Sequence, residues 1–314
     1  MAVEERERLD ADLQRIAQAD LKQLGDIRID DVLSFIDRGI ERMPSYMDLY
    51  RRWESQQWSV GDLDFSLDRE DWLKSTDIER KATLWSHRLF FNGEERVTST
   101  LAPFVWAAPS PEIEIFLSTQ LVDEARHTVF FQRWWQEVVG TETKDLGQLL
   151  DEIRPEANEG YNEIFYNRLP ATAQRLASNP RDMDAFVEGV TLYHIVIEAT
   201  IALTGQRFEL EAMREVGSTD RGFYRGFTAI ARDESRHVSF GIKFLQEAVR
   251  QDPQRFAPLI QKTLVECLPL ITGVLDPPDP RYITDFGHTE SEIVAFAFES
   301  LNRRLRAIGI NLAA

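Results

Sequence analysis

The sequence predicts an all-α fold in which four long helices form a bundle with a metal site in its core and extra helices flank it. Three observations favour this class. Helical spacing of apolar residues dominates the chain, and the long alternating runs that are typical of strands are scarce. Four segments are long enough to form a bundle. Two of them carry the same five-residue frame of acidic, basic and histidine side chains. We therefore expect one domain over residues 1–314, with its core at about 76–250.

The bulk composition limits the classes of function. Hydrophobic residues make up 43% of the chain, so a sizeable globular core is expected. The formal net charge of -17 argues against a nucleic-acid partner and against docking on anionic lipid, which both need a basic surface. Cys267 is the only cysteine, so no intramolecular disulfide can form. The charged N-terminus lacks the apolar run of a signal peptide, and no stretch approaches 18 apolar residues, so we expect a cytoplasmic protein without a membrane span.

The N-terminal part is expected to be a helical extension. Residues 1–55 have the pattern of short helices, where Asp30 or Asp31 caps one and Pro44 starts another. Residues 56–75 contain a glycine and several aspartates, and we predict an irregular segment there.

The four long helices follow, and local signals mark their ends. Thr76 and Glu79 form a capping-box pattern, and Ser110 precedes Pro111, which suits the first helical position. The predicted helices are about Thr76–Phe104, Ser110–Val139, Asp182–Phe208 and Thr219–Arg250.

Shorter helices are expected around them. The segment of roughly 40 residues between the second and third long helices has the pattern of short helices. The proline-rich run 276–280 breaks any helix. Residues 281–314 should form a C-terminal helix, with an amphipathic stretch at Glu290–Ile308 that packs on the outside of the bundle.

The frame Asp-Glu-x-Arg-His occurs at 123–127 and again at 233–237. Each copy places a glutamate three residues before a histidine, namely Glu124 with His127 and Glu234 with His237. Residues three apart share a helix face, so each pair can reach one ion or two neighbouring ions. A single such pair is weak evidence, but two copies of the longer frame in a chain with five histidines indicate a shared site.

A di-metal site in a bundle also takes one glutamate from each of the other two helices. The first long helix offers Glu94 or Glu95, and Glu94 has the more apolar neighbours at helical spacing. The third offers Glu188 and Glu198, and Glu198 sits in an apolar stripe where an unpaired carboxylate would be costly. The intervals from Glu94 to Glu124 and from Glu198 to Glu234 are 30 and 36 residues, which fits two similar helix pairs.

The charges of such a site balance, because four carboxylates offset two divalent ions. Carboxylate and imidazole ligands suit iron and manganese. A simpler interpretation is that these side chains are surface ion pairs and two core histidines. The remaining histidines lack the frame and are interpreted as structural or surface residues: His87, His194 and His288.

These residues resemble the ligand-binding oxidases of the ribonucleotide reductase small-subunit-like superfamily, whose fold is ferritin-like. The resemblance is carried by segments 93–98 (Gly-Glu-Glu-Arg-Val-Thr), 123–128 (Asp-Glu-Ala-Arg-His-Thr) and 193–198 (Tyr-His-Ile-Val-Ile-Glu), with Ala-Leu-Thr-Gly at 202–205. It covers roughly residues 55–250 and leaves both ends of the chain uncovered.

The resemblance implies a manganese–iron or di-iron cofactor that activates dioxygen, and a long-chain fatty acid or other apolar molecule bound beside it. It implies an ether crosslink between the Cβ atom of Val97 and the oxygen of Tyr193. It also implies that Asp233, together with Trp58, holds a metal-bound histidine. On the residues alone, Val97 and Trp58 would be core and Tyr193 a buried hydrogen bonder. We further expect a homodimer.

Helical spacing around the ligands predicts an apolar ligand pocket, although most such residues in a bundle belong to the core. The predicted lining residues are Phe90, Phe91, Leu101, Phe131 and Ile201.

Other functions stay open at this point. A ribonucleotide reductase small subunit often carries a radical tyrosine four residues after the first histidine ligand, where this chain has Phe131. Such a subunit also needs a tyrosine in its C-terminal tail, and the last tyrosine here is Tyr282. A small-molecule mono- or N-oxygenase is a further alternative, as are a lipid-binding protein and a metal store that perform no turnover.

Overall fold

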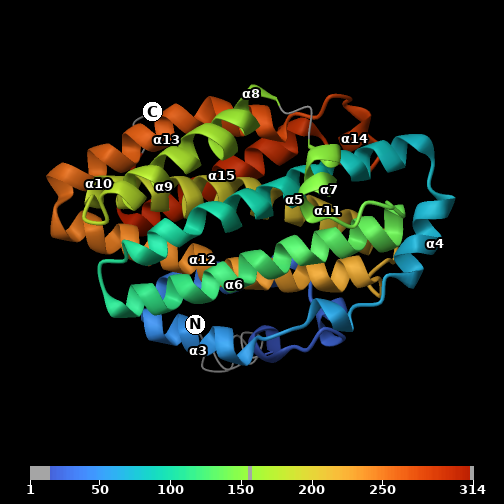
Figure 1. Ribbon diagram of the computed structural model, residues 1–314, viewed down its shortest axis with the longest axis horizontal. Coiled ribbons are helices and arrows are strands. Elements are labelled where there is room, and N and C mark those ends of the chain that lie inside the picture. The colour runs from blue at the N-terminus through green and yellow to red at the C-terminus, as the bar shows by residue number, and fades with distance from the viewer. Residues whose placement is uncertain (1–14, 155–157, 312–314) are drawn as a thin grey trace, which may run out of the picture.

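The computed structural model describes residues 15–154 and 158–311, and this part of the chain is helical, with no strand. Parts of the predicted 1–55 extension and of the 281–314 helix lie outside the described residues. Four long helical segments form the core bundle, and Figure 1 shows α5 and α6 running side by side. Their bounds are α5 Asp77–Trp106, α6 Pro111–Trp134, α12 Gly222–Gln251, and a continuous third segment made of α10 Met183–Val190, η5 Thr191–Ala202 and α11 Leu203–Glu215.

The predicted caps of the first two long helices are confirmed. The Thr76 side chain accepts a hydrogen bond from the Glu79 amide while Glu79 bonds back to Thr76, which makes a capping box. Ser110 accepts from the amide of Ile113, and Pro111 occupies the first turn of α6. The α6 segment ends in a short π-helical turn, η3 Trp135–Val139, followed by a left-handed glycine at position 140.

The α12 helix is capped from a distant part of the chain. Its N-cap residue, Arg221, offers no side-chain cap. Asp68 of α4 (Ser66–Lys74) instead accepts hydrogen bonds from the amides of Gly222 at 2.9 Å and Phe223 at 3.0 Å. Burial raises the pKa of Asp68 to about 6, and the two amides offset part of that effect. Because the two residues lie 154 positions apart, this cap could not be read from local sequence.

The N-terminal elements differ in detail from the prediction. Asp30 and Asp31 lie inside the first turn of α2 and do not precede it. Ser45, and not Pro44, caps the next helix by accepting from Asp48. The segment 56–75 is not irregular throughout, because it contains a 3-10 turn and a short helix. The elements are η1 Gln23–Asp26, α2 Ile29–Glu41, α3 Tyr46–Ser55, η2 Val60–Asp62 and α4 Ser66–Lys74.

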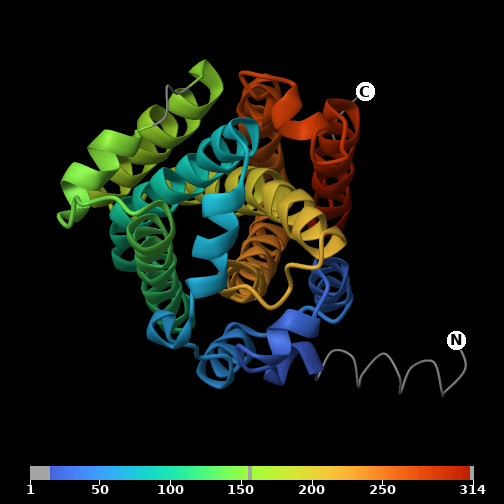
Figure 2. The ribbon, with the colours of Figure 1, turned by 90° about the vertical axis from the view of Figure 1, so that its right-hand side faces the viewer.

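The remaining helices flank the bundle, and the end-on view in Figure 2 shows them around it. One of them, α13 Pro253–Leu275, was not among the predicted elements, although it follows α12 directly. The predicted C-terminal helix is present as α15, and Ser300 on it donates to the carbonyl of Ala199 in η5 at 3.1 Å. The others are α7 Leu146–Ile153, α8 Glu159–Tyr161, η4 Asn162–Arg168, α9 Leu169–Ser178, α14 Arg281–Thr284 and α15 Glu290–Ile308.

The third long helix has a π-helical middle, η5, which changes where its side chains point. The amide of Leu203 bonds to the carbonyl of Glu198, and the Thr200 hydroxyl bonds to the carbonyl of Ile195, both five residues back. In a π-turn, residues five apart are about one turn apart. Tyr193 and Glu198 therefore share a face, whereas α-helical geometry predicts that Tyr193 lies beside the site.

Two glycines bring the third long helix close to α5. A Cβ atom on Gly189 would lie 2.3 Å from the ring of Phe104, and one on Gly205 would lie 2.8 Å from the ring of Phe90. Both distances are shorter than a side chain tolerates. These glycines let α5 and the third helix meet at two points and leave space between them, where the site lies.

Two helices are long and apolar enough to cross a membrane by length and composition alone. In Met183–Glu215 the relevant window is 89% buried inside the protein, as in a core helix; in Pro253–Leu275 it is 39% buried. Such helices are weak evidence for a span, because core helices of globular proteins pass the same test.

Candidate metal centre

The structure brings the six predicted ligands together in the middle of the bundle. Two overlapping groups have ligand atoms within 4.8 Å of one another, and every member is buried. Glu124 and Glu234 belong to both groups, so the glutamate of each repeated frame lies between the two positions. The first group is Glu94, Glu124, His127 and Glu234, and the second is Glu124, Glu198, Glu234 and His237.

The two histidines face the carboxylates in matching ways. The Nδ1 atom of His127 lies 3.4 Å from an oxygen of Glu94 and 3.4 Å from one of Glu124. The Nδ1 atom of His237 lies 3.2 Å from oxygens of Glu124 and Glu198 and 3.4 Å from Glu234. Both Nδ1 atoms are buried without a hydrogen-bond partner, as is the second oxygen of Glu198. Unpaired buried polar atoms that converge on one point fit two metal ions.

The electrostatics of the cluster point the same way. Burial raises the pKa of Glu94 to about 8, and burial beside Glu234 raises the pKa of Glu198 well above its usual range. Burial alone would lower the pKa of His127, but the carboxylates around it, led by Glu94, raise it far above the usual value. A carboxylate cluster in this core needs positive charge, which protons supply in the metal-free protein and two divalent cations would supply in their place.

One outward contact holds His127, and it was predicted. Its Nε2 atom donates to Asp233 at 3.4 Å, and the indole of Trp58 donates to the same carboxylate at 2.8 Å. The arginines Arg236 and Arg126 hold the pKa of Asp233 far below its ordinary value against the effect of burial. An ionised Asp233 can accept both donors and fix the imidazole with its Nδ1 atom toward the ion position.

A second, equivalent contact was not predicted. His237 donates from Nε2 to Asp123 at 3.2 Å, and the indole of Trp53 in α3 donates to Asp123 at 2.9 Å. The signal was present in the sequence, because Asp123 holds the same place in its frame as Asp233. The tryptophan carried no such signal, since it reaches Asp123 from 70 residues away.

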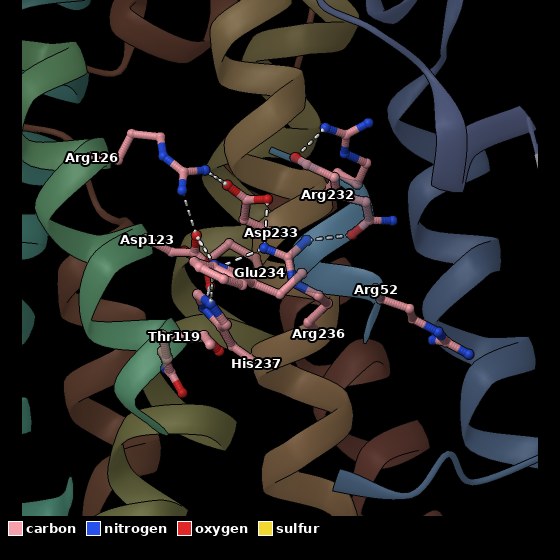
Figure 3. Close-up of polar contacts among 12 residues, drawn as sticks. Arg52, Thr119, Asp123, Arg126, Arg232, Asp233, Glu234, Arg236 and His237 are labelled. Carbon is pink, nitrogen blue, oxygen red and sulfur yellow. Dashed lines mark hydrogen bonds and ion pairs between the residues drawn. The ribbon is translucent and has the colours of Figure 1, made fainter. Parts of the chain in front are cut away.

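The arginines of the two frames connect the helices, as Figure 3 shows. Arg236 donates to Asp233 of its own helix at 2.7 Å and to Asp123 of α6 at 2.8 Å. Arg126 reaches Asp123 at 3.2 Å and Asp233 at 3.5 Å. Each arginine thus binds both aspartates. These contacts between the two helices are a physical reason for the arginine in the repeated frame.

Residues near Glu198 add a polar contact without an equivalent near Glu94. The amide of Gln120 donates to Glu198 at 2.9 Å, and its oxygen pairs with His194 Nε2 at 3.1 Å. Burial and the nearby His237 lower the pKa of His194 to about 3, so His194 is neutral and donates to Gln120. Neither residue was predicted in this role.

The three other histidines lie outside both ligand groups. His194 has the contact with Gln120 just described. His87 is buried and pairs with Glu209 at 2.5 Å, stacked on the ring of Phe223. His288 packs edge-on against Phe208 with ring centroids 4.9 Å apart.

An apolar cavity of about 110 Å³ opens onto the cluster. Four of the six ligands form part of its wall, and Val97 and Tyr193 also line it. The Tyr193 hydroxyl donates to Glu124 at 2.7 Å, and burial next to Glu124 raises the pKa of Tyr193 well above its usual value. The other lining residues are Trp85, Ser86, Leu89, Phe90, Gly93, Tyr161, Phe165, Ile197, Ile201, Ala202, Gly205, Val274 and Leu275.

Two of the five predicted pocket residues line this cavity, Phe90 and Ile201. Phe91, Leu101 and Phe131 do not line it. All three are buried, and the rings of Phe91 and Phe131 pack together with their centroids 6.2 Å apart. Helical spacing placed them near the ligands, but their side chains fill the core and leave the cavity wall to residues from several other elements.

A helical bundle whose four long segments direct four glutamates and two histidines to one buried point defines a carboxylate-rich di-metal protein. The chain belongs to the ribonucleotide reductase small-chain family, whose sequence model matches residues 41–270. The fold is accordingly the ferritin-like helical fold of that family.

Solved structures of R2-like ligand-binding oxidases are similar to this protein over most of the chain. A valine-to-leucine variant of an R2-like ligand-binding oxidase, anaerobically reconstituted with a Mn/Fe cofactor, is 28% identical with a TM-score of 0.72 and covers 86% of this chain and 94% of its own. A valine-to-alanine variant is 27% identical with a TM-score of 0.73 and the same coverage. A tyrosine-to-phenylalanine variant, reconstituted aerobically, is 27% identical with a TM-score of 0.72 and the same coverage.

Proposed function

We propose that the protein is a dioxygen-activating oxidase that uses a Mn/Fe or Fe/Fe pair and acts beside a bound apolar molecule. The observation that carries this proposal is the apolar cavity that ends on the ligand cluster. When bound, the two ions would supply the redox chemistry that activates dioxygen. The protein residues would hold the ions, and the apolar cavity wall would limit the access of water and leave one side open for a ligand.

In this proposal the six buried side chains have distinct roles. Glu94 and His127 would hold one ion, Glu198 and His237 would hold the other, and Glu124 and Glu234, which belong to both ligand groups, would contribute to both positions. Asp233 with Trp58, and Asp123 with Trp53, would orient the two histidines.

The cavity supports a ligand of apolar character. Its lining is mostly apolar, and four of the proposed metal ligands form part of its wall. A long-chain fatty acid suits both the apolar wall and the metal-ligand end of the cavity. Its hydrocarbon chain would contact the wall, and its carboxylate would bind the ions. Extraction of purified protein into organic solvent, followed by mass spectrometry, tests this; an empty extract would contradict it.

We also propose the Val97–Tyr193 ether crosslink. Both residues line the cavity, and Tyr193 is hydrogen bonded to Glu124. The reaction breaks the Cβ–H bond of Val97 and the O–H bond of Tyr193, forms one Cβ–O bond, and releases two protons and two electrons to dioxygen. The hydrogen bond to Glu124 offers a carboxylate that takes the phenolic proton.

Three measurements test the proposal in sequence. Protein loaded with Fe(II) and Mn(II) should hold about two ions per chain. Exposure of the reduced, loaded protein to air should change its absorption spectrum, and no change with both ions bound would favour a storage or structural role. Peptide mapping should then find α5 joined to η5 with the loss of about two hydrogens, and Tyr193→Phe should abolish the joined peptide while both ions stay bound.

A true reductase subunit is the less supported alternative. Phe131, where such subunits often have a redox tyrosine, is fully buried among the rings of Phe91, Phe130 and Phe223.

We further propose that the chain is a cytoplasmic homodimer. The single cysteine, Cys267, is buried, and burial raises the pKa of its thiol to about 11, so it is a poor candidate for disulfide exchange.

A further inference from the structure

A second cavity lies beside Trp58, on the N-terminal side of α12. Its volume is about 420 Å³, and sites for small organic molecules usually have roughly 300–1,000 Å³. None of the six metal ligands lines it, so it is separate from the apolar cavity at the metal centre. We name it the Trp58 cavity. Its wall consists of residues 19–22, 57–58 and 62–64 together with Gly222, Arg225 and Arg232 of α12.

A buried arginine in this wall has no carboxylate partner. Arg232 is 1% exposed, and its guanidinium donates to the backbone carbonyls of Ala19 at 2.6 Å and Gln56 at 3.0 Å, while its Nε atom has no acceptor. Within the part of the chain that the structure describes, Arg232 forms no ion pair. Arg236, one turn further along α12, differs because it contacts Asp123 and Asp233, as Figure 3 shows. A buried charge with only neutral acceptors is unfavourable, so the environment of Arg232 favours a bound anion.

The charges of the layer behind the two ligand histidines do not balance. Arg126 and Arg236 bind both aspartates of the layer, and Arg232 binds neither. Arginine keeps its charge at any physiological pH, so one positive charge is in excess. The metal centre would not offset it, because two divalent ions would balance the four ligand glutamates. The layer consists of Arg126, Arg232, Arg236, Asp123 and Asp233.

A second arginine lines the same cavity without a partner. Arg225 lies on α12 seven residues before Arg232, which is about two helical turns. It is half-buried, and its Nε atom is buried without an acceptor. The guanidinium of Arg225 forms no hydrogen bond or ion pair with any residue that the structure describes. Lys22, which is exposed, adds a third cationic side chain to the wall.

The carboxylates of the Trp58 cavity stand at its exposed rim. Asp20, Asp62 and Asp64 are all exposed to solvent, which screens their charges. Two of them serve local turns, because Asp20 accepts from the amide of Gln23 at 2.8 Å and Asp64 accepts from the amide of Ser66 at 2.9 Å. The inner wall is therefore cationic, although the formal net charge of the chain is -17.

We propose that the Trp58 cavity binds a small organic anion, whose carboxylate or phosphate group contacts Arg225 and Arg232. The guanidinium fork suits both of these groups, because each offers two oxygens to parallel N–H donors. The rest of the molecule would pack against Trp58, Leu21 and Leu63, which give the same wall an apolar part. This inference rests on the cavity and its charges and does not depend on the oxidase chemistry.

Calorimetric titration of the full-length, metal-loaded protein tests the site, with adenosine monophosphate, citrate and inorganic phosphate as probes. We expect saturable binding of at least one of the two organic anions. Adenosine, which lacks the phosphate group, should bind at least about tenfold more weakly than its monophosphate, because it cannot form the charge-assisted hydrogen bonds. Inorganic phosphate that binds as tightly as both organic anions would indicate an adventitious ion only and would overturn the proposal.

Removal of the metals with a chelator distinguishes this cavity from the metal centre. Protein without metal should bind the same organic anion, because no metal ligand lines the Trp58 cavity. Loss of binding after chelation would place the anion on the ions themselves and would contradict the proposal.

Two arginine variants on the same helix provide the decisive comparison. Arg225→Gln should weaken binding of the organic anion at least about tenfold, which is the scale of a hydrogen bond to a charged group. Its fold should persist, because the Arg225 guanidinium has no hydrogen bond to lose, and urea unfolding checks this. Arg250→Gln, at an exposed position near the end of α12 and outside the cavity, is the matched control and should bind normally. Unchanged binding by Arg225→Gln, equal losses in both variants, or no saturable binding of either organic anion to the wild type would overturn the proposal.

Discussion

The two halves of the metal cluster have the same outward support and different inner surroundings. In one half Trp58 and Asp233 hold His127, and in the other Trp53 and Asp123 hold His237. The two histidines have equivalent outward support because the frame is repeated. The arginine of each frame contacts the aspartates of both frames, and these contacts join α6 to α12.

The difference comes from the two helices that supply one glutamate each. Glu94 stands on a regular α-helix. Glu198 stands on the π-helical segment η5 and is held by Gln120, which is held in turn by His194. The comparison teaches that a repeated sequence can build two equal outer supports while the neighbouring helices make the two ion positions unequal. Four predictions break or sharpen this comparison.

Removing a ligand histidine should have the largest effect. We expect His127→Ala and His237→Ala each to lose at least one of the two ions, because an imidazole ligand cannot be replaced by the remaining carboxylates without changing the charge and geometry of the site. Metal analysis after gel filtration measures this. His288→Ala, at a histidine outside both ligand groups, should keep both ions. Two ions bound to His127→Ala would refute the assigned ligand set.

The cap of α12 should make stability depend on pH. The pKa of Asp68 is about 6 in the folded protein, above the ordinary 3.8 of an unfolded aspartate. The folded state thus favours the protonated form, so this contribution to stability is complete below pH 3.8 and is lost as the pH rises through 6. At about 1.4 kcal/mol per pKa unit, the loss is at most about 3 kcal/mol.

Urea unfolding of wild type and Asp68→Asn between pH 4 and about 7 isolates this effect, since the other groups contribute equally to both proteins. The difference between the two unfolding free energies should change across that window. A constant difference would show that Asp68 titrates normally. No corresponding change is expected for α6, whose cap is the uncharged Ser110.

Asp233 and Asp123, which orient the two ligand histidines, should contribute equally to ion affinity if the two halves of the metal cluster are equivalent. Asp233→Asn and Asp123→Asn should each weaken the ion on the neighbouring histidine by about 10- to 100-fold, as is usual for residues that orient a ligand. Competition with a chelator measures the two affinities, and Asp285→Asn at an exposed site serves as the control. A full effect at Asp233 with none at Asp123 would mean that only the first half needs its outward support.

Gln120 should account for part of the inequality between the halves. Gln120→Leu removes the hydrogen bond to Glu198 and leaves His194 without its acceptor. The expected result is about a tenfold weaker ion beside His237, which is the scale of one hydrogen bond to a charged group, and an unchanged ion beside His127. Equal weakening at both positions would indicate a general disturbance of the core.

The sequence alone predicted much of the bundle and of the candidate ligand set. The capping box at Thr76, the cap at Ser110 and the doubled frame are local patterns, and local patterns survive in any fold that keeps the helices. The choice of Glu94 over Glu95 also followed from periodicity, and the structure has Glu94 buried while Glu95 pairs with Arg96 at 2.5 Å.

Tertiary structure decided what depends on distant segments meeting. Trp53 reaches Asp123 across 70 residues, and Asp68 caps α12 across 154. The cavity wall comes from several elements, so helical spacing on single helices could not define it, and Phe131 went into the core instead. The π-helical hydrogen bonding of η5 places Tyr193 and Glu198 on the same face of the helix. No residue pattern in this chain predicted these backbone hydrogen bonds. Periodicity sets which face of a helix is apolar, but only packing sets what that face meets.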